Sequence, residues 1–131
     1  MKVEELLLEM YTAYVLTDDS RDALLGKYPP KYSKVIGHHV TVDFGVPAGT
    51  TAPENADVVV HGIKDSGDGL EALVVSVNGS RERPNGGFYH ITWSLEPDKY
   101  SPKDSNALMS NGKRYTIALP IPLETVPEVL K

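Results

Sequence analysis

The apolar residues of this chain occur in short runs that glycine and proline interrupt, and this pattern limits the possible folds more than any other feature. Most of these runs are rich in Val, Ile, Thr and Tyr, which favours strands over helices. The 131 residues include 11 Gly and 10 Pro, and Pro120, Pro122 and Pro127 rule out a long helix after residue 119. We therefore expect six strands, over residues 11–17, 35–44, 57–63, 70–77, 88–95 and 114–119.

Two short helices are expected between these strands, and residues 1–10 have the spacing of a further short helix or an extended lead-in. Asp18-Asp19-Ser20 offers N-cap oxygens to the first helix, and Gly26 is placed to end it in a left-handed conformation. Ser101-Pro102-Lys103-Asp104 has the form of a capping box with proline at the first helical position. Asn111-Gly112 would stop the helix that this box opens.

Length and composition indicate one globular domain. A hydrophobic share of 40% with 24% charged residues is ordinary for such a domain. A chain of 131 residues can bury one modest core, whereas two independent domains would each be marginal. The mixture of strands and short helices predicts a single α+β domain over residues 1–131, with mainly antiparallel sheet.

Charge and cysteine content narrow the classes of function. A net charge of −5 argues against a sequence-independent grip on duplex DNA, which depends on surplus Lys and Arg. The absence of Cys removes thiolate catalysis, disulfide frameworks and Cys-ligated zinc. No apolar run reaches the 18 or more residues of a membrane span, and the acidic start Met1-Lys2-Val3-Glu4-Glu5 is unlike a signal peptide. We therefore expect a cytoplasmic protein without a membrane partner.

Two of the expected strands carry the same tripeptide, His39-Val40-Thr41 and His90-Ile91-Thr92. Side chains alternate along a strand, so each His shares one face with its Thr while the aliphatic residue lies on the other. By the same rule His38 points away from His39, and Trp93 lies on the core face. Two such strands, set side by side with their polar faces inward, would form a cluster of two imidazoles and two hydroxyls.

Such a cluster suits the cleavage of a phosphodiester. One imidazole can take a proton from the attacking oxygen while the other gives one to the leaving oxygen, and their usual pKa near 6.5 permits both roles at neutral pH. The hydroxyls of Thr41 and Thr92 would donate hydrogen bonds to the non-bridging phosphate oxygens. No Asp/Glu cluster at metal-ligand spacing accompanies the motifs, which favours a reaction without metal or cofactor. The alternative is two structural histidines that bond neighbouring threonines.

The paired motifs resemble those of the two-histidine (2H) phosphoesterases, which include RNA ligase-like 2′,5′ enzymes and cyclic phosphodiesterases. The order of strands and helices is similar over Tyr11 to Leu119. The resemblance implies two pseudo-symmetric antiparallel sheet lobes around a central cleft, with short flanking helices and one motif from each lobe. It also implies metal-independent action on a 2′,3′-cyclic phosphate or a 2′-linked phosphodiester of a nucleotide or RNA end. The catalytic residues would be His39, Thr41, His90 and Thr92.

Three further residues are candidates for substrate binding. Tyr14, on the first strand, can stack a nucleobase or serve as half-buried packing. Arg81 and Arg83 lie in a polar, Gly-rich loop, where they can hold a second phosphate through paired hydrogen bonds or remain exposed loop charges.

Rival functions remain open on the sequence alone. The substrate can instead be a cyclic di- or trinucleotide messenger, as in phage members of the same superfamily. A nucleotide-binding module without turnover would keep the fold, and a plain interaction domain would place His39 and His90 far apart. The sequence does not fix the natural substrate, the oligomeric state or which histidine is the base.

Overall fold

The structure is a computed structural model that describes residues 10–84, 86–112 and 114–131. The expectation for residues 1–10 falls, apart from Met10, outside the described residues. In chain order the elements are β1 (Tyr11–Leu16), α2 (Asp18–Lys27), β2 (Lys34–Val35), β3 (His39–Phe44), β4 (Val58–Asp65), β5 (Leu70–Val77), β6 (His90–Leu95), the 3₁₀ turn η1 (Pro102–Asp104), α3 (Ser105–Ser110), β7 (Thr116–Leu123) and β8 (Thr125–Leu130).

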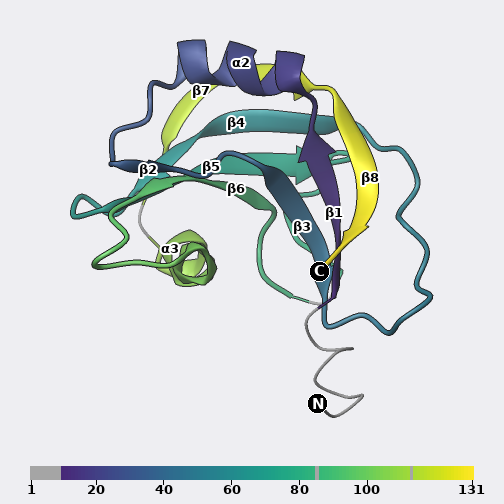
Figure 1. Ribbon diagram of the computed structural model, residues 1–131. Helices are drawn as coiled ribbons and strands as arrows, with labels where there is room; N and C mark the ends of the chain where they lie inside the picture. Colours follow the sequence, from purple (N-terminus) through teal and green to yellow (C-terminus); the bar gives the residue numbers. More distant parts are fainter. Residues whose placement is uncertain (1–9, 85, 113) are drawn as a thin grey trace.

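The fold is α+β, with two antiparallel sheets and short helices, as the sequence predicts (Figure 1). One sheet has three strands in the order β3–β1–β8, and the other has five in the order β2–β6–β5–β4–β7. The chain therefore builds the smaller sheet from both of its ends, because β8 returns to pair with β1. The two sheets differ in strand number, so the two lobes are unequal. None of the helices in the described ranges is long and apolar enough to cross a membrane.

The predicted strand 35–44 is interrupted, and its two parts belong to different sheets. β2 pairs with β6, whereas β3 pairs with β1. The break falls at Gly37, whose φ of +47° is a left-handed conformation that favours glycine. A Cβ at this position would lie 2.8 Å from the Trp93 ring, so glycine is also required by close packing. The single-strand prediction was wrong because this glycine turns the chain from one sheet into the other.

The C-terminal strands extend further than the sequence suggests. The prediction ended the last strand at residue 119, but β7 continues to Leu123 and β8 follows after one residue. Proline disfavours a central strand because it has no N–H to donate, yet it is tolerated at sheet edges. Pro120 and Pro122 lie in β7 and Pro127 in β8, and both strands are at the edge of their sheet.

The ends of the helices differ in detail from the prediction. The N-cap of α2 is Thr17, whose hydroxyl accepts a hydrogen bond from the N–H of Ser20 at 3.2 Å, and the two aspartates lie in the first turn. Gly26 does not end this helix, which continues to Lys27. The capping box is confirmed, since the Asp104 carboxylate accepts a hydrogen bond from the N–H of Ser101 at 2.8 Å. It opens η1 directly before α3, and α3 stops at Asn111-Gly112 as expected.

The core fixes which way the motif strands face. Val40 and Ile91 are 0% exposed and pack in one core with Trp93, which is also fully buried. Burial of one such aliphatic side chain contributes roughly 1.5–3 kcal/mol. Leu108 and Met109 of α3 pack on the opposite face of the five-stranded sheet. The alternation predicted for both motifs is therefore confirmed, and His39, Thr41, His90 and Thr92 are turned away from the shared core.

Candidate active site

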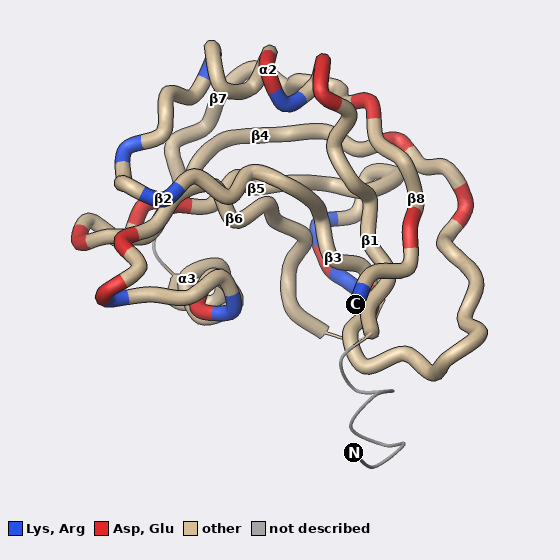
Figure 2. The backbone as a smooth tube through the Cα atoms, in the orientation of Figure 1, with Lys and Arg blue, Asp and Glu red and all other residues tan. Residues whose placement is uncertain are grey.

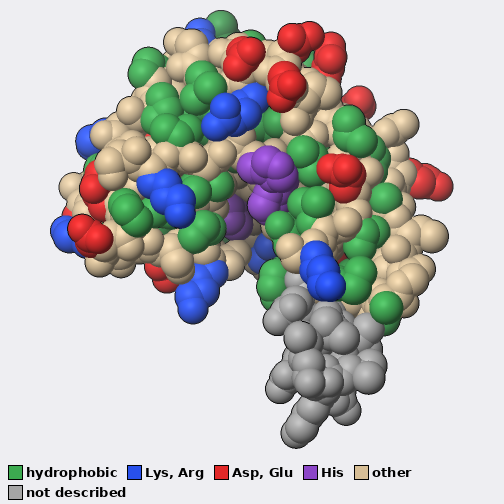
Figure 3. Space-filling model, viewed as in Figure 1, with side chains coloured by type: hydrophobic (Ala, Val, Ile, Leu, Met, Phe, Trp, Pro, Cys, Tyr) green, Lys and Arg blue, Asp and Glu red, His purple; other side chains and the backbone are tan. Residues whose placement is uncertain are grey.

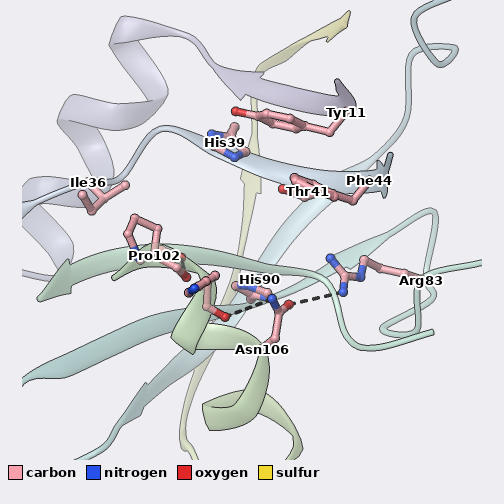
Figure 4. Close-up of a pocket in the computed structure, with 11 residues that line it drawn as sticks. Tyr11, Ile36, His39, Thr41, Phe44, Arg83, His90, Pro102 and Asn106 are labelled. Atoms are coloured by element: carbon pink, nitrogen blue, oxygen red, sulfur yellow. Dashed lines mark hydrogen bonds between the residues drawn. The ribbon is translucent and has the colours of Figure 1, made fainter. Parts of the chain in front are cut away.

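All four motif residues line one cavity, which lies where β3 of the smaller sheet meets β6 of the larger one. Its volume is about 500 Å³, within the usual range of roughly 300–1,000 Å³ for small-molecule sites. Figure 3 shows histidine side chains gathered in a hollow at the centre of this face. Figure 4 shows the lining side chains, which are Tyr11, Ile36, His39, Thr41, Phe44, Arg83, His90, Thr92, Pro102, Lys103 and Asn106.

Aromatic side chains form one side of the cavity beside His39. The Tyr11 ring lies 5.3 Å from the His39 ring, and it stacks on Phe44 with the ring centroids 5.7 Å apart. Phe44 is 67% exposed, although phenylalanine is among the residues most often buried in proteins. We call Tyr11 and Phe44 the aromatic ledge. Sequence reasoning missed both residues, although their place at the ends of paired strands is a usable signal.

His38 does not point away from His39, contrary to the prediction. Nδ1 of His38 lies 2.9 Å from Nδ1 of His39, and the two rings meet edge to face. The alternation rule fails here because β3 begins at His39, so His38 lies outside the strand, directly after the left-handed Gly37. The adjacent histidines form a hydrogen-bonded pair.

The electrostatic surroundings of His39 disfavour its charged form. Burial is the main cause, and it lowers the pKa of His39 from 6.5 to about 4, with further lowering from His38 and His90. The effect of His90 means that the two motif imidazoles lie within electrostatic reach of each other. At neutral pH, His39 is therefore neutral.

His90 is held in one tautomer by the backbone. Its Nδ1–H donates a hydrogen bond to the carbonyl oxygen of Phe88 at 2.8 Å. Burial lowers the pKa of His90; the bond to Phe88 opposes this lowering, and the charge of Arg83 adds to it. A neutral His90 with its proton on Nδ1 has a lone pair on Nε2, the nitrogen that a general base needs.

Thr92 is connected to helix α3 through its hydroxyl. Oγ1 of Thr92 lies 2.9 Å from Oγ of Ser105, and its contact with the carbonyl oxygen of Pro102 is longer, at 3.3 Å. Ser105 is fully buried and was not among the sequence candidates. Nothing in its local sequence marks it, because the contact depends on how α3 packs on the sheet.

Of the two candidate arginines, Arg83 alone lines the cavity. Its Nη2 donates to Oδ1 of Asn106 at 3.3 Å (Figure 4). Its Nε donates to the carbonyl oxygen of Gly86 at 3.1 Å. The Arg81 guanidinium instead lies over the ring of Tyr115, 4.9 Å from its centroid, and also close to Phe88. Arg83 is therefore available to a phosphate in the cavity, whereas Arg81 is not among the residues that line it.

Tyr14 lies in the core, which does not agree with the stacking of a nucleobase in the cleft. It is 5% exposed and its hydroxyl donates to the carbonyl oxygen of Glu54 at 2.8 Å. In β1 it pairs with Val40 on the core face, whereas Ala13 pairs with Thr41 on the cavity face. The packing alternative is the one that the structure supports.

The cavity differs in charge from the rest of the chain. Arg83 and Lys103 line it and, among the described residues, no acidic side chain does, although the whole chain has a net charge of −5. Figure 2 shows acidic residues along α2, β8 and the outer turns. The cavity thus presents positive charge within an acidic protein, which favours an anionic ligand.

The donor set and the comparisons complete the description of the site. Among the described residues, no three or more His, Asp or Glu side chains are grouped in a way that could hold a metal ion. Comparison of the chain with protein-family models, with curated proteins and with solved structures finds no match.

Proposed function

We propose that this chain is a metal-independent phosphodiesterase that acts on a 2′,3′-cyclic phosphate or a 2′-linked phosphodiester of a nucleotide or RNA end. One observation carries the proposal: a His and a Thr from each of two sheets line the same cavity. A phosphate held among these four side chains would have an imidazole on each side for proton transfer. The proposal agrees with the resemblance of the two tripeptides to those of the 2H phosphoesterases.

His90 is the better candidate for the base. Its Nδ1–H bond to Phe88 keeps the lone pair on Nε2 and also stabilises the imidazolium that forms when Nε2 accepts a proton. In hydrolysis, Nε2 of His90 takes a proton from water while the water oxygen attacks phosphorus. The acid is then His39, which gives a proton to the leaving oxygen.

The two threonines stabilise the charge that develops on the phosphate. Thr41 and Thr92 are placed in the cavity to donate to non-bridging oxygens. Ser105 can donate its proton to Oγ1 of Thr92, which leaves the Thr92 proton free for a phosphate oxygen in place of the long contact to Pro102. Each such donor contributes about 10²–10³ in kcat in comparable sites.

The charge and the aromatic rings of the other lining residues suit a nucleotide. Arg83 and Lys103 attract the anion, and the aromatic ledge offers a stacking surface for a base. The acidic balance of the whole chain favours a small nucleotide or an RNA terminus over a long duplex. The absence of Cys agrees with a cytoplasmic site of action, which we include in the proposal.

The test is hydrolysis of a substrate panel in the presence of EDTA. The panel contains the four 2′,3′-cyclic nucleotides, a 2′,5′-linked dinucleotide and cyclic dinucleotides. The proposal predicts turnover of a cyclic phosphate or a 2′-linked substrate that EDTA leaves unchanged. Turnover of cyclic dinucleotides alone would reassign the substrate to immune messengers, and tight binding without turnover would indicate a binding module. Turnover that EDTA abolishes would contradict the metal-independent mechanism.

A further inference from the structure

We propose that His38 and His39 act together as one acid, with His38 as a positioning residue that carries the positive charge. This inference rests on the proposed function, because it explains how a partly buried imidazole can deliver a proton. The observation behind it is the 2.9 Å contact between the Nδ1 atoms of the two rings. His38 is exposed and is not among the residues that line the cavity.

A contact between two imidazole nitrogens at this distance requires one proton between them. When His38 donates, Nδ1 of His39 is the acceptor and the His39 proton resides on Nε2, where it can meet a leaving oxygen. When His39 donates, its Nε2 carries a lone pair, which is its state after giving up a proton. The same hydrogen bond therefore fits His39 before and after proton transfer.

Two hydrogen bonds hold the backbone at Gly37 and His38. Arg21 of α2 donates through Nε to the carbonyl oxygen of Gly37 at 2.9 Å, and Leu16 donates its N–H to the carbonyl oxygen of His38 at 3.0 Å. Gly37 itself packs against Trp93 in a left-handed conformation. These contacts hold His38 beside His39, where the alternation of a regular strand would have turned it away.

The burial of His39 explains why the positive charge would lie on His38. A charge on His39 must be desolvated in the cavity, and with a pKa of about 4 roughly 0.1% of His39 would be protonated at pH 7. A charge on the exposed His38 ring stays in contact with water and avoids that cost. In the part of the chain that the structure describes, the titratable or charged groups around the pair are His90 across the cavity, Tyr11 against the His39 ring, and Arg21 behind Gly37.

The proton transfer balances in atoms and charge. As the bond from phosphorus to the leaving ribose oxygen breaks, that oxygen takes the bonding electron pair and the Nε2 proton of His39. Nδ1 of His39 takes the Nδ1 proton of His38, so the His38 imidazolium becomes neutral and His39 stays neutral. After the product leaves, a solvent proton binds Nε2 of His39 and the Nδ1 proton returns to His38. His90 releases to solvent the proton that it took from the attacking water.

The kinetic test compares His38→Gln and His38→Phe with wild type on two substrates. The first is a 2′,3′-cyclic nucleotide, and the second is a p-nitrophenyl phosphodiester, whose leaving group needs no protonation. Glutamine keeps a hydrogen bond to His39 but cannot carry the charge. We expect both variants to lose about 10- to 100-fold in kcat on the nucleotide and less than about threefold on the nitrophenyl ester, near the lower end of general-acid effects. The basic limb of the pH–rate profile should also move to lower pH.

An equal loss on both substrates would overturn the proposal, because it would show a structural role for His38. The matched control is His61→Gln, since His61 bonds Ser76 at 2.6 Å and lies outside the cavity. This control should leave both rates unchanged.

A second measurement does not depend on turnover. Nitrogen-15 NMR of the imidazoles reports which nitrogen of His39 carries the proton and at what pH the pair titrates. We expect the Nδ1 signals of both rings to titrate together in wild type, and the tautomer of His39 to change in His38→Phe. If no phosphodiester is turned over but the signals are coupled, the proposed function fails and the shared proton stands. Independent titration of the two rings would overturn the shared proton, whatever the activity.

Discussion

The hydroxyl of Thr92 lies 2.9 Å from the hydroxyl of Ser105, and this contact joins the second motif strand to helix α3. Ser105 is fully buried, and α3 is held by Leu108 and Met109 against the larger sheet. When the enclosed Ser105 hydroxyl donates to Oγ1 of Thr92, the Thr92 proton is free to point to another acceptor. The packing of α3 therefore affects the orientation of the Thr92 hydroxyl, which faces the proposed phosphate.

Replacement of Ser105 with alanine should lower kcat while leaving the fold intact. Ser105→Ala removes the hydroxyl that contacts Oγ1 of Thr92, so we expect about a tenfold loss in kcat, smaller than the 10²–10³ expected for Thr92→Val. Steady-state kinetics at saturating substrate measure the effect. Ser110→Ala is the control, since the Ser110 hydroxyl donates to the backbone of Asn106 on the exposed side of α3. Full activity in Ser105→Ala would show that the hydroxyl contact has no role.

The stability of the protein should fall between pH 6.5 and 4. Burial lowers the pKa of His39 to about 4 and also lowers the pKa of His90, while the unfolded values stay near 6.5. Below pH 6.5 the unfolded chain binds protons that the folded chain does not, so stability that is complete above this pH is lost as the pH falls. For His39 the loss is at most about 3 kcal/mol.

Urea unfolding from pH 8 to pH 4 measures this effect. His39→Gln has no imidazole at this position and should show a flatter dependence of the unfolding free energy on pH than wild type. Identical slopes in the two proteins would contradict the lowered pKa of His39.

Gly37 should tolerate a side chain less well than another left-handed glycine. Gly37→Ala meets the Trp93 ring at 2.8 Å, whereas Gly49, also at positive φ, has nothing within 4 Å of an added Cβ. Both changes place alanine in a left-handed conformation, at a cost of roughly 1–2 kcal/mol. Thermal unfolding should therefore show a larger loss for Gly37→Ala, together with lower activity, because β3 starts two residues later. Equal losses of thermal stability in the two variants would show that the Trp93 ring moves aside at little cost in free energy.

Most of the fold was predictable because it follows local rules. Val40 and Ile91 alternate with His and Thr, and this pattern alone gave the correct face for all four motif residues. The errors arise where tertiary contacts override local preference. Gly37 turns an apparently continuous strand between two sheets, and the edge position of β8 accommodates Pro127, which suggested a break.

Only the central residues of the cavity, from β3 and β6, could be predicted from the sequence. The two tripeptides identified the residues that line it from β3 and β6, but the position of Lys103 and Asn106 depends on where η1 and α3 pack. Arg81 and Arg83 are indistinguishable in sequence, and the structure separates them because a turn around Gly86 directs only Arg83 to the cavity.

Removal of the cavity cations should weaken binding of an anionic substrate. We expect Arg83→Gln and Lys103→Gln to raise KM several-fold with a smaller effect on kcat, and the effect should shrink as salt is added. Lys27→Gln, at the exposed end of α2, is the control for the loss of one positive charge. Equal KM values for all three variants would show that charge at the cavity does not contribute to binding.

The central claim is that His39 and His90 together carry out phosphodiester cleavage. The most direct measurement is single-turnover cleavage of the best panel substrate in EDTA by wild type, His39→Gln, His90→Gln and the control His61→Gln. If the two histidines act together, each of the first two variants should lose about 10²–10⁴ in rate, and His61→Gln should keep the wild-type rate. Retention of the wild-type rate by either His39→Gln or His90→Gln would contradict the central claim.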